Sequence, residues 1–176
     1  MRLAGIGLLA AGVTASLYVA GRLNTPDYAF GLFGQVGLGA IALKSMLASV
    51  TLGLAVLQVL LALWIYRKLP LAGSQPRPVR LTHKIIGFGL FALTVPIAVH
   101  CLLAYGVQLT TARVAVHSLA WCFFYGAFTA KVLLVQSRRL PGWALPAAGG
   151  ALAILVAVLW YTSALWYYNG YQLPAM

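Results

Sequence analysis

Residues 82–131 read THKIIGFGLFALTVPIAVHCLLAYGVQLTTARVAVHSLAWCFFYGAFTAK, and they hold two apolar runs joined by a short polar turn at residues 106–113. Each apolar run carries one histidine near the turn, His100 before it and His117 after it. In antiparallel helices with the turn centred near residue 108, both histidines lie about two helical turns deep. The stretch therefore predicts a helical hairpin that carries two imidazoles at one depth.

The whole chain shares the apolar character of this hairpin. Of its 176 residues, 62% are apolar and only 7% are charged, and the mean hydropathy is +0.93. About 20 consecutive apolar residues suffice for a helix to cross a bilayer, and helices satisfy their own backbone hydrogen bonds where no water is present. We therefore expect an all-α, multi-pass integral membrane bundle surrounded by lipid rather than a soluble domain.

Apolar runs separated by polar turns predict five transmembrane helices in a single transmembrane domain, residues 1–176. We expect the first to be retained as an anchor helix rather than cleaved as a signal peptide. The prolines at positions 76 and 78 are expected to prevent a continuous helix through the polar linker 71–80. The predicted spans are about 3–20, 41–66, 82–105, 111–136 and 143–168.

The net charge of +11, with Asp27 as the only acidic residue, bears on partners and orientation. No soluble basic segment is present to carry nucleic acid, so no nucleic-acid partner is expected. Nine of the twelve Lys and Arg residues belong to one predicted side, and only Arg22, Lys44 and Arg113 belong to the other. The positive-inside rule then places the N-terminus in the cytoplasm and the C-terminus, with the 106–113 turn, outside.

The two histidines at matched depth are the leading candidates for chemistry. Ionisable side chains inside membrane helices are costly and usually face the bundle interior. His100 and His117 on adjacent helices suit ligation of a haem iron from both sides. An interhelical hydrogen bond from each imidazole is the structural alternative. Zinc is disfavoured, because two histidines without a nearby acid or cysteine ligand supply too few donors.

Other candidates share the faces of these histidines. On the helix after the turn, the His117 face also holds Arg113, Ala120 and Phe124. We expect Arg113 to meet haem propionates, Ala120 to leave room and Phe124 to line the edge of the ring. Gly89 lies on the His100 face, where its small size suits a flat ligand. A packing stripe at helical spacing explains the same residues without a ligand.

His83 and Lys131 are predicted near the cytoplasmic end. His83 precedes His100 by 17 residues, about 25 Å along a helix. A quinone contact, a proton relay or ligation of a second haem are the functional alternatives for this pair. An interfacial histidine and a lysine that reaches the lipid headgroups are the structural ones. No nucleophile–base–acid set or phosphate-binding motif is found, which disfavours hydrolysis and phosphoryl transfer.

Three segments carry a resemblance to known families: HKIIGFGLFALTVPIAVHCLLAYG (83–106), ARVAVHSLAWCFFYGAFTAKVLLVQSRRLPGWALPAAGG (112–150) and SALWYY (163–168). Together they resemble a small family of bacterial five-helix membrane proteins of unknown function. More loosely, they resemble b-type cytochrome membrane subunits of the ferric reductase-like and hydrogenase-type groups. Those subunits hold haem b between paired histidines, and the likeness carries over to one site, at His100 and His117.

The residues and the resemblance together predict a b-type cytochrome subunit of the bacterial plasma membrane. It would hold one haem b, with a second as an open alternative. It would pass electrons between a membrane quinone and a redox partner at the outer face, such as a cytochrome c or an iron–sulfur protein. With almost no mass outside the membrane, it is expected to work with other subunits of a redox complex. A haem-free structural or assembly subunit is the alternative, and a transporter is disfavoured.

Overall fold

A computed structural model describes residues 3–69, 77–137 and 141–173 of the chain. In these ranges the protein is all-helical apart from an isolated β-bridge between Leu32 and Gln35. Five spans are long and apolar enough to cross a membrane. They are α1 (Leu3–Leu23), α2 (Gly37–Ile65), α3 (Arg77–Ala104), α4 (Ala112–Gln136) and a fifth span made of α5 (Ala144–Trp160), η1 (Tyr161–Leu165) and α6 (Trp166–Tyr168). The prediction of an all-α bundle with five such helices is confirmed.

Two helix starts differ from the prediction. α2 begins at Gly37 rather than near residue 41. α3 begins at Arg77 rather than near residue 82, so Pro78 lies in its first turn. Proline is tolerated in the first turn of a helix, because the amide that it lacks has no partner there. The linker residues 70–76 lie outside the described residues.

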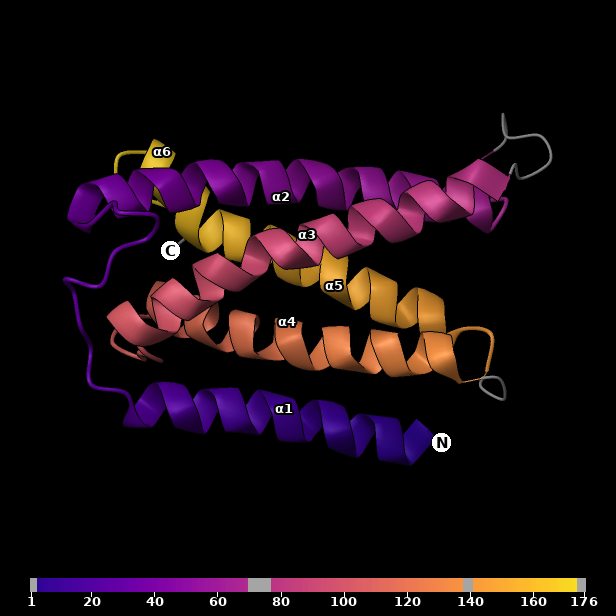
Figure 1. The fold of residues 1–176 in the computed structure, drawn as a ribbon, viewed down its shortest axis with the longest axis horizontal. Coiled ribbons are helices and arrows are strands. Elements are labelled where there is room, and N and C mark those ends of the chain that lie inside the picture. The colour runs from indigo at the N-terminus through magenta and orange to yellow at the C-terminus, as the bar shows by residue number, and fades with distance from the viewer. Residues whose placement is uncertain (1–2, 70–76, 138–140, 174–176) are drawn as a thin grey trace.

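The five spans run antiparallel to their neighbours in sequence, and the N- and C-terminal ends lie at opposite ends of the bundle (Figure 1). α1 packs on α4, α4 packs on α5, and α2 packs on both α3 and α5. α3 crosses the bundle obliquely, beside α2 (Figure 1). The consecutive helices α3 and α4 are therefore not each other's main packing partners, which matters for the space between them.

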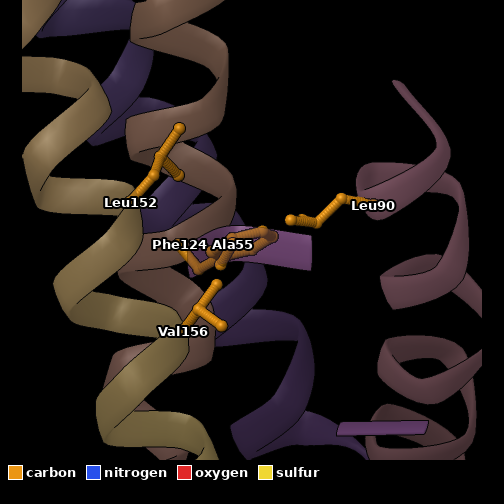
Figure 2. Close-up of a cluster of buried hydrophobic side chains, with 5 residues drawn as sticks. All are labelled: Ala55, Leu90, Phe124, Leu152 and Val156. Carbon is orange, nitrogen blue, oxygen red and sulfur yellow. The ribbon is translucent and has the colours of Figure 1, made fainter. Parts of the chain in front are cut away.

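A cluster of apolar side chains holds the middle of the bundle together. It joins α2, α3, α4 and α5 through the side chains shown in Figure 2: Ala55, Leu90, Phe124, Leu152 and Val156. Large apolar residues on the outside are left exposed; Leu8 is 75% exposed, Phe88 72% and Ile154 65%. Such a surface is stable only against lipid or another apolar surface, as expected for a membrane bundle.

Close glycine contacts fix α1 against the rest. A Cβ placed on Gly126 of α4 would lie 2.8 Å from the carbonyl oxygen of Ala10 and would also overlap Thr14. At the end of α3, Gly106 has a φ of +66° and turns the chain, after which the Val107 amide donates to the Gly21 carbonyl at 2.8 Å. The α3–α4 turn is thereby anchored to the end of α1.

Candidate functional site

A cavity lies among α2, α3, α4 and the fifth span. The cavity volume is about 90 Å³, and the empty space rises to about 610 Å³ when the open space at its mouth is counted. The surface of the lining is mainly apolar, although the lining includes Thr51, Thr94, His117, Tyr125 and Ser163. The lining residues are Ala48, Thr51, Thr94, Ile97, Ala98, Cys101, His117, Trp121, Phe124, Tyr125, Val156, Leu159, Trp160 and Ser163.

Large side chains bridge α3 and α4 on the side of the cavity toward the middle of the bundle. Phe91 stacks on Phe128 with 3.9 Å between ring centroids, and the Tyr125 hydroxyl donates to Thr94 Oγ1 at 3.1 Å. Helices in direct contact lie about 8–10 Å apart, whereas aromatic side chains of this size act as spacers. These aromatic side chains therefore hold α3 and α4 apart, which leaves space for a ligand between the two histidine-bearing helices.

His117 projects from α4 into this lining and is held from behind by the fifth span. Its Nδ1 lies 2.9 Å from the Thr162 hydroxyl oxygen, and that hydroxyl donates its one hydrogen to the Val158 carbonyl at 2.7 Å. Thr162 must then accept from an Nδ1–H group, which fixes the tautomer of the ring. The other nitrogen, Nε2, keeps its lone pair, as in metal-ligating histidines whose second nitrogen is hydrogen-bonded.

The π-helical turn η1 receives a second contact from α4. Arg113 lies one turn before His117, and its Nη1 donates to the Thr162 carbonyl at 2.9 Å. Its guanidinium carbon lies 3.8 Å from the centre of the Trp166 ring. Thr162 is fully buried, and two side chains of α4, Arg113 and His117, are hydrogen-bonded to it. π turns recur at functional sites. The sequence analysis missed Thr162, although the polar run Tyr161–Ser163 in an apolar span signals a functional position.

His100 lies near the same end of the bundle, but its surroundings differ. It is 2% exposed, and its ring centroid is 5.7 Å from that of Tyr105 and 6.1 Å from that of Phe30. The backbone of Phe30 is nearby, yet neither ring nitrogen makes a hydrogen bond of ordinary geometry. An unpaired polar group in the interior is costly, and two on one ring are unusual.

The two imidazoles do not touch each other. His117 lines the cavity, whereas on α3 the neighbouring Cys101 does so and His100 does not. No hydrogen bond or ring contact joins His100 to His117 in the described residues. Nor do those residues contain a group of three or more His, Cys, Asp or Glu side chains able to hold a metal ion. The structure thus brings the two histidine-bearing helices to one cavity, with only the α4 ring facing into it.

Of the other predicted site residues on α3 and α4, one lines the cavity and two do not. Phe124 lines the cavity and is 2% exposed. Ala120 is buried but lies outside the lining. Gly89 is exposed, and a Cβ added to it would meet nothing within 4 Å. The space expected at Gly89 therefore lies on the outside of α3 and not toward His117.

His83 and Lys131 form a separate group toward the other end. The His83 carbonyl accepts from Gln58 Nε2 at 2.8 Å, and Lys131 lies near the end of α4, at the same end of the bundle as the start of α3. His83 Nδ1 and Gln58 Oε1 are both buried without a hydrogen-bond partner. These residues do not line the cavity. Gln58 was missed in the sequence analysis, although a glutamine inside an apolar helix is a polar signal of the same kind.

Five helices long and apolar enough to cross a membrane, four of which surround a cavity, are typical of a small multi-pass membrane protein. The chain belongs to DUF6529, a family of unknown function, whose profile matches residues 3–175. No curated protein and no solved structure matches the chain. The looser resemblance to b-type cytochrome subunits gains no support from these comparisons.

Proposed function

We propose that this protein is a b-type cytochrome subunit of the bacterial plasma membrane, with one haem b in the cavity. The observation that carries the proposal is the hydrogen bonding of the two ring nitrogens of His117. Its Nδ1–H is committed to Thr162, and its Nε2 is free on a ring that lines an apolar cavity. A neutral imidazole with one fixed nitrogen and one free nitrogen is the form that binds iron.

His117 is the one histidine in the cavity lining, so a haem with two histidine ligands needs His100 as well. His100 supplies a second buried imidazole, with both nitrogens unpaired, from the helix that forms the other wall. Ligation by His100 requires its ring to turn away from Phe30 and toward the side of α3 that Cys101 occupies. The free nitrogens and the spacing of α3 from α4 favour a flat ligand over a simple pair of hydrogen bonds.

The chain's own residues would position and insulate the group. Thr162 holds the His117 ring, and Arg113 holds the Thr162 carbonyl. Trp121 and Phe124 form apolar walls that exclude water. A bound haem supplies one-electron chemistry, and the protein sets its potential through ligation, burial and nearby charge.

The proposed electron transfer runs between a membrane quinone and a redox partner outside. The excess of Lys and Arg at the end that carries Arg67 and Lys68 supports a cytoplasmic position for that end. The cavity, displaced toward the 106–111 end, would then serve an extracytoplasmic cytochrome c or iron–sulfur protein. The group of Gln58, His83 and Lys131 supplies polar atoms for the quinone, with a second haem at His83 as the alternative.

A haem-free structural or assembly subunit is the second candidate function. One observation favours it: Gly5 and Gly12, seven residues apart on one face of α1, have nothing within 4 Å of an added Cβ. Small residues on an open helix face permit close approach of another transmembrane helix. This face also suits a cytochrome subunit in a complex, so it does not by itself decide between the two functions.

The difference spectrum of the purified protein tests the proposal. Dithionite-reduced minus oxidised absorbance should show a b-type haem band, and His117→Ala should remove it. His100→Ala should remove it or convert it to the spectrum of a haem with one histidine. His83→Ala is the matched control and should keep the full band. A folded protein purified from haem-sufficient cells without any band would overturn the proposal, and full haem in both the His100→Ala and His117→Ala variants would overturn the ligand assignment.

A further inference from the structure

Two cationic side chains lie one helical turn before residues that line the cavity. On α2, Lys44 is spaced i, i+4 and i+7 with Ala48 and Thr51, which both line the cavity. On α4, Arg113 lies one turn before His117, which lines it too. Residues with these spacings share a helix face. Lys44 and Arg113 therefore continue two walls of the cavity toward the 106–111 end.

Each of these cations rests on an aromatic ring. Lys44 Nζ lies 4.3 Å from the centre of the Tyr105 ring, and the Arg113 guanidinium lies 3.8 Å from that of Trp166. Tyr105 follows the lining residue Cys101 by four positions, so it belongs to the same end of the cavity. Cation–π contact orients a charged group without neutralising it. This end thus combines two oriented positive charges with two aromatic rings.

The protein itself provides no side-chain carboxylate for these charges. Asp27 is the only acidic residue in the sequence, and its carboxylate accepts from the Ala29 amide at 3.0 Å within its own loop. Charges that lie within a membrane span without a partner are costly and are usually functional.

We propose that Lys44 and Arg113 form a paired cation site that binds the acidic end of the ligand in the cavity. The ligand is then an amphiphile whose apolar body lies against Phe124 and Trp121 and whose carboxylates point toward the 106–111 end. With the proposed function, on which this orientation rests, the carboxylates are the two haem propionates. A fatty acid carries the same chemistry from another source. Lys44, which the sequence analysis left unassigned, becomes a binding residue.

Reconstitution of the haem-depleted full chain in detergent with protohaem and with its dimethyl ester tests this site. The ester keeps the ring and the iron but carries no carboxylate charge. The wild type should bind the free acid about tenfold more tightly, the size of one charge-assisted contact. Lys44→Met should remove most of this preference, whereas Lys44→Arg should keep it. Lys68→Met, three residues beyond the far end of α2, is the matched control and should behave as the wild type.

The outcomes separate this site from the haem proposal. Equal binding of acid and ester by the wild type, or an unchanged preference in Lys44→Met, would overturn the cation site even where haem binds. If neither porphyrin binds, the haem proposal fails, and stearate against methyl stearate in native mass spectrometry becomes the deciding pair. Retention of stearate alone, lost in Lys44→Met, would support the cation site with a lipid ligand. No preference between those two probes would overturn it.

Discussion

The Nδ1 atom of His117 lies 2.9 Å from the hydroxyl oxygen of Thr162, and this contact joins α4 to the π turn of the fifth span. Because the Thr162 hydroxyl donates to the Val158 carbonyl, we assign the imidazole as the donor and the hydroxyl as the acceptor of this contact. A side chain that was only packing would not need this arrangement. This hydrogen bond therefore connects the π-helical turn at residues 161–165 with the tautomer of the His117 ring.

Thr162→Val tests whether this contact supports the site. The substitution keeps the shape of the side chain but leaves the Nδ1–H group of His117 buried without an acceptor, which costs about 1–3 kcal/mol. We expect lower thermal stability in detergent and, if haem is bound, weaker retention of it during purification. Absorbance and circular dichroism during heating provide the measurement.

Thr129→Val is the matched control, because the Thr129 hydroxyl bonds only to the Tyr125 carbonyl of its own helix at 2.9 Å. Its effect should stay within about 0.5 kcal/mol, as for substitutions away from any tertiary contact. Equal losses in Thr162→Val and Thr129→Val would show that His117 does not depend on Thr162.

Gly126→Ala tests the close approach of α1 and α4. The added methyl group meets the Ala10 carbonyl oxygen at 2.8 Å, so the two helices must separate, at a cost of about 1–3 kcal/mol. Gly89→Ala provides the contrast, since its methyl group meets nothing within 4 Å. Alanine is the better helix former by about 1 kcal/mol, so Gly89→Ala should be neutral or stabilising.

Unfolding of both glycine variants in mixed micelles by added denaturing detergent measures the difference. A destabilised Gly89→Ala would mean that the exposed side of α3 contacts another subunit or a ligand. A stable Gly126→Ala would contradict the tight α1–α4 contact.

Gln58→Leu tests the inner polar group. The substitution removes the donor to the His83 carbonyl and also the unpaired Oε1 atom, so the change in stability should be small, below about 1 kcal/mol. If the group recognises a quinone, reduction of the haem by a short-chain quinol should slow several-fold while haem content stays constant. Gln136→Leu, exposed at the same end of the bundle, should leave the rate unchanged. Equal rates in both variants would contradict a quinone contact at Gln58.

Sequence reasoning found the five spans because hydropathy and turn residues report directly on insertion into a bilayer. It also placed His100 and His117 near one end, since depth follows from counting residues along antiparallel helices. It did not find which helices pack together. Apolar helices in lipid have no polar face to show which side is buried, because lipid is as apolar as their partners. Gly89 was therefore assigned to the interior, although it lies outside.

Other parts of the site depend on contacts between segments far apart in sequence. The π turn at residues 161–165 and the acceptor role of Thr162 become visible only when α4 lies against the fifth span. The environment of His100 depends on Phe30, a residue of the loop between α1 and α2. Lys44 appeared to be an ordinary lysine near a helix start until its ring contact with Tyr105 and its place on the cavity face of α2 were known. Periodicity within one helix carries no information about such partners.

Labelling of single cysteines tests the orientation that the excess of Lys and Arg predicts. Tyr28 is 70% exposed in the loop at the 106–111 end, and Lys68 is exposed at the opposite end. The native thiols are unpaired, Cys122 being buried and Cys101 partly buried, so both are first replaced by alanine. A membrane-impermeant maleimide should label Tyr28→Cys in intact cells and Lys68→Cys only after lysis, because positively charged loops stay in the cytoplasm. The reverse pattern would place the cavity at the cytoplasmic side, and the redox partner of the proposed cytochrome would then have to be a cytoplasmic protein.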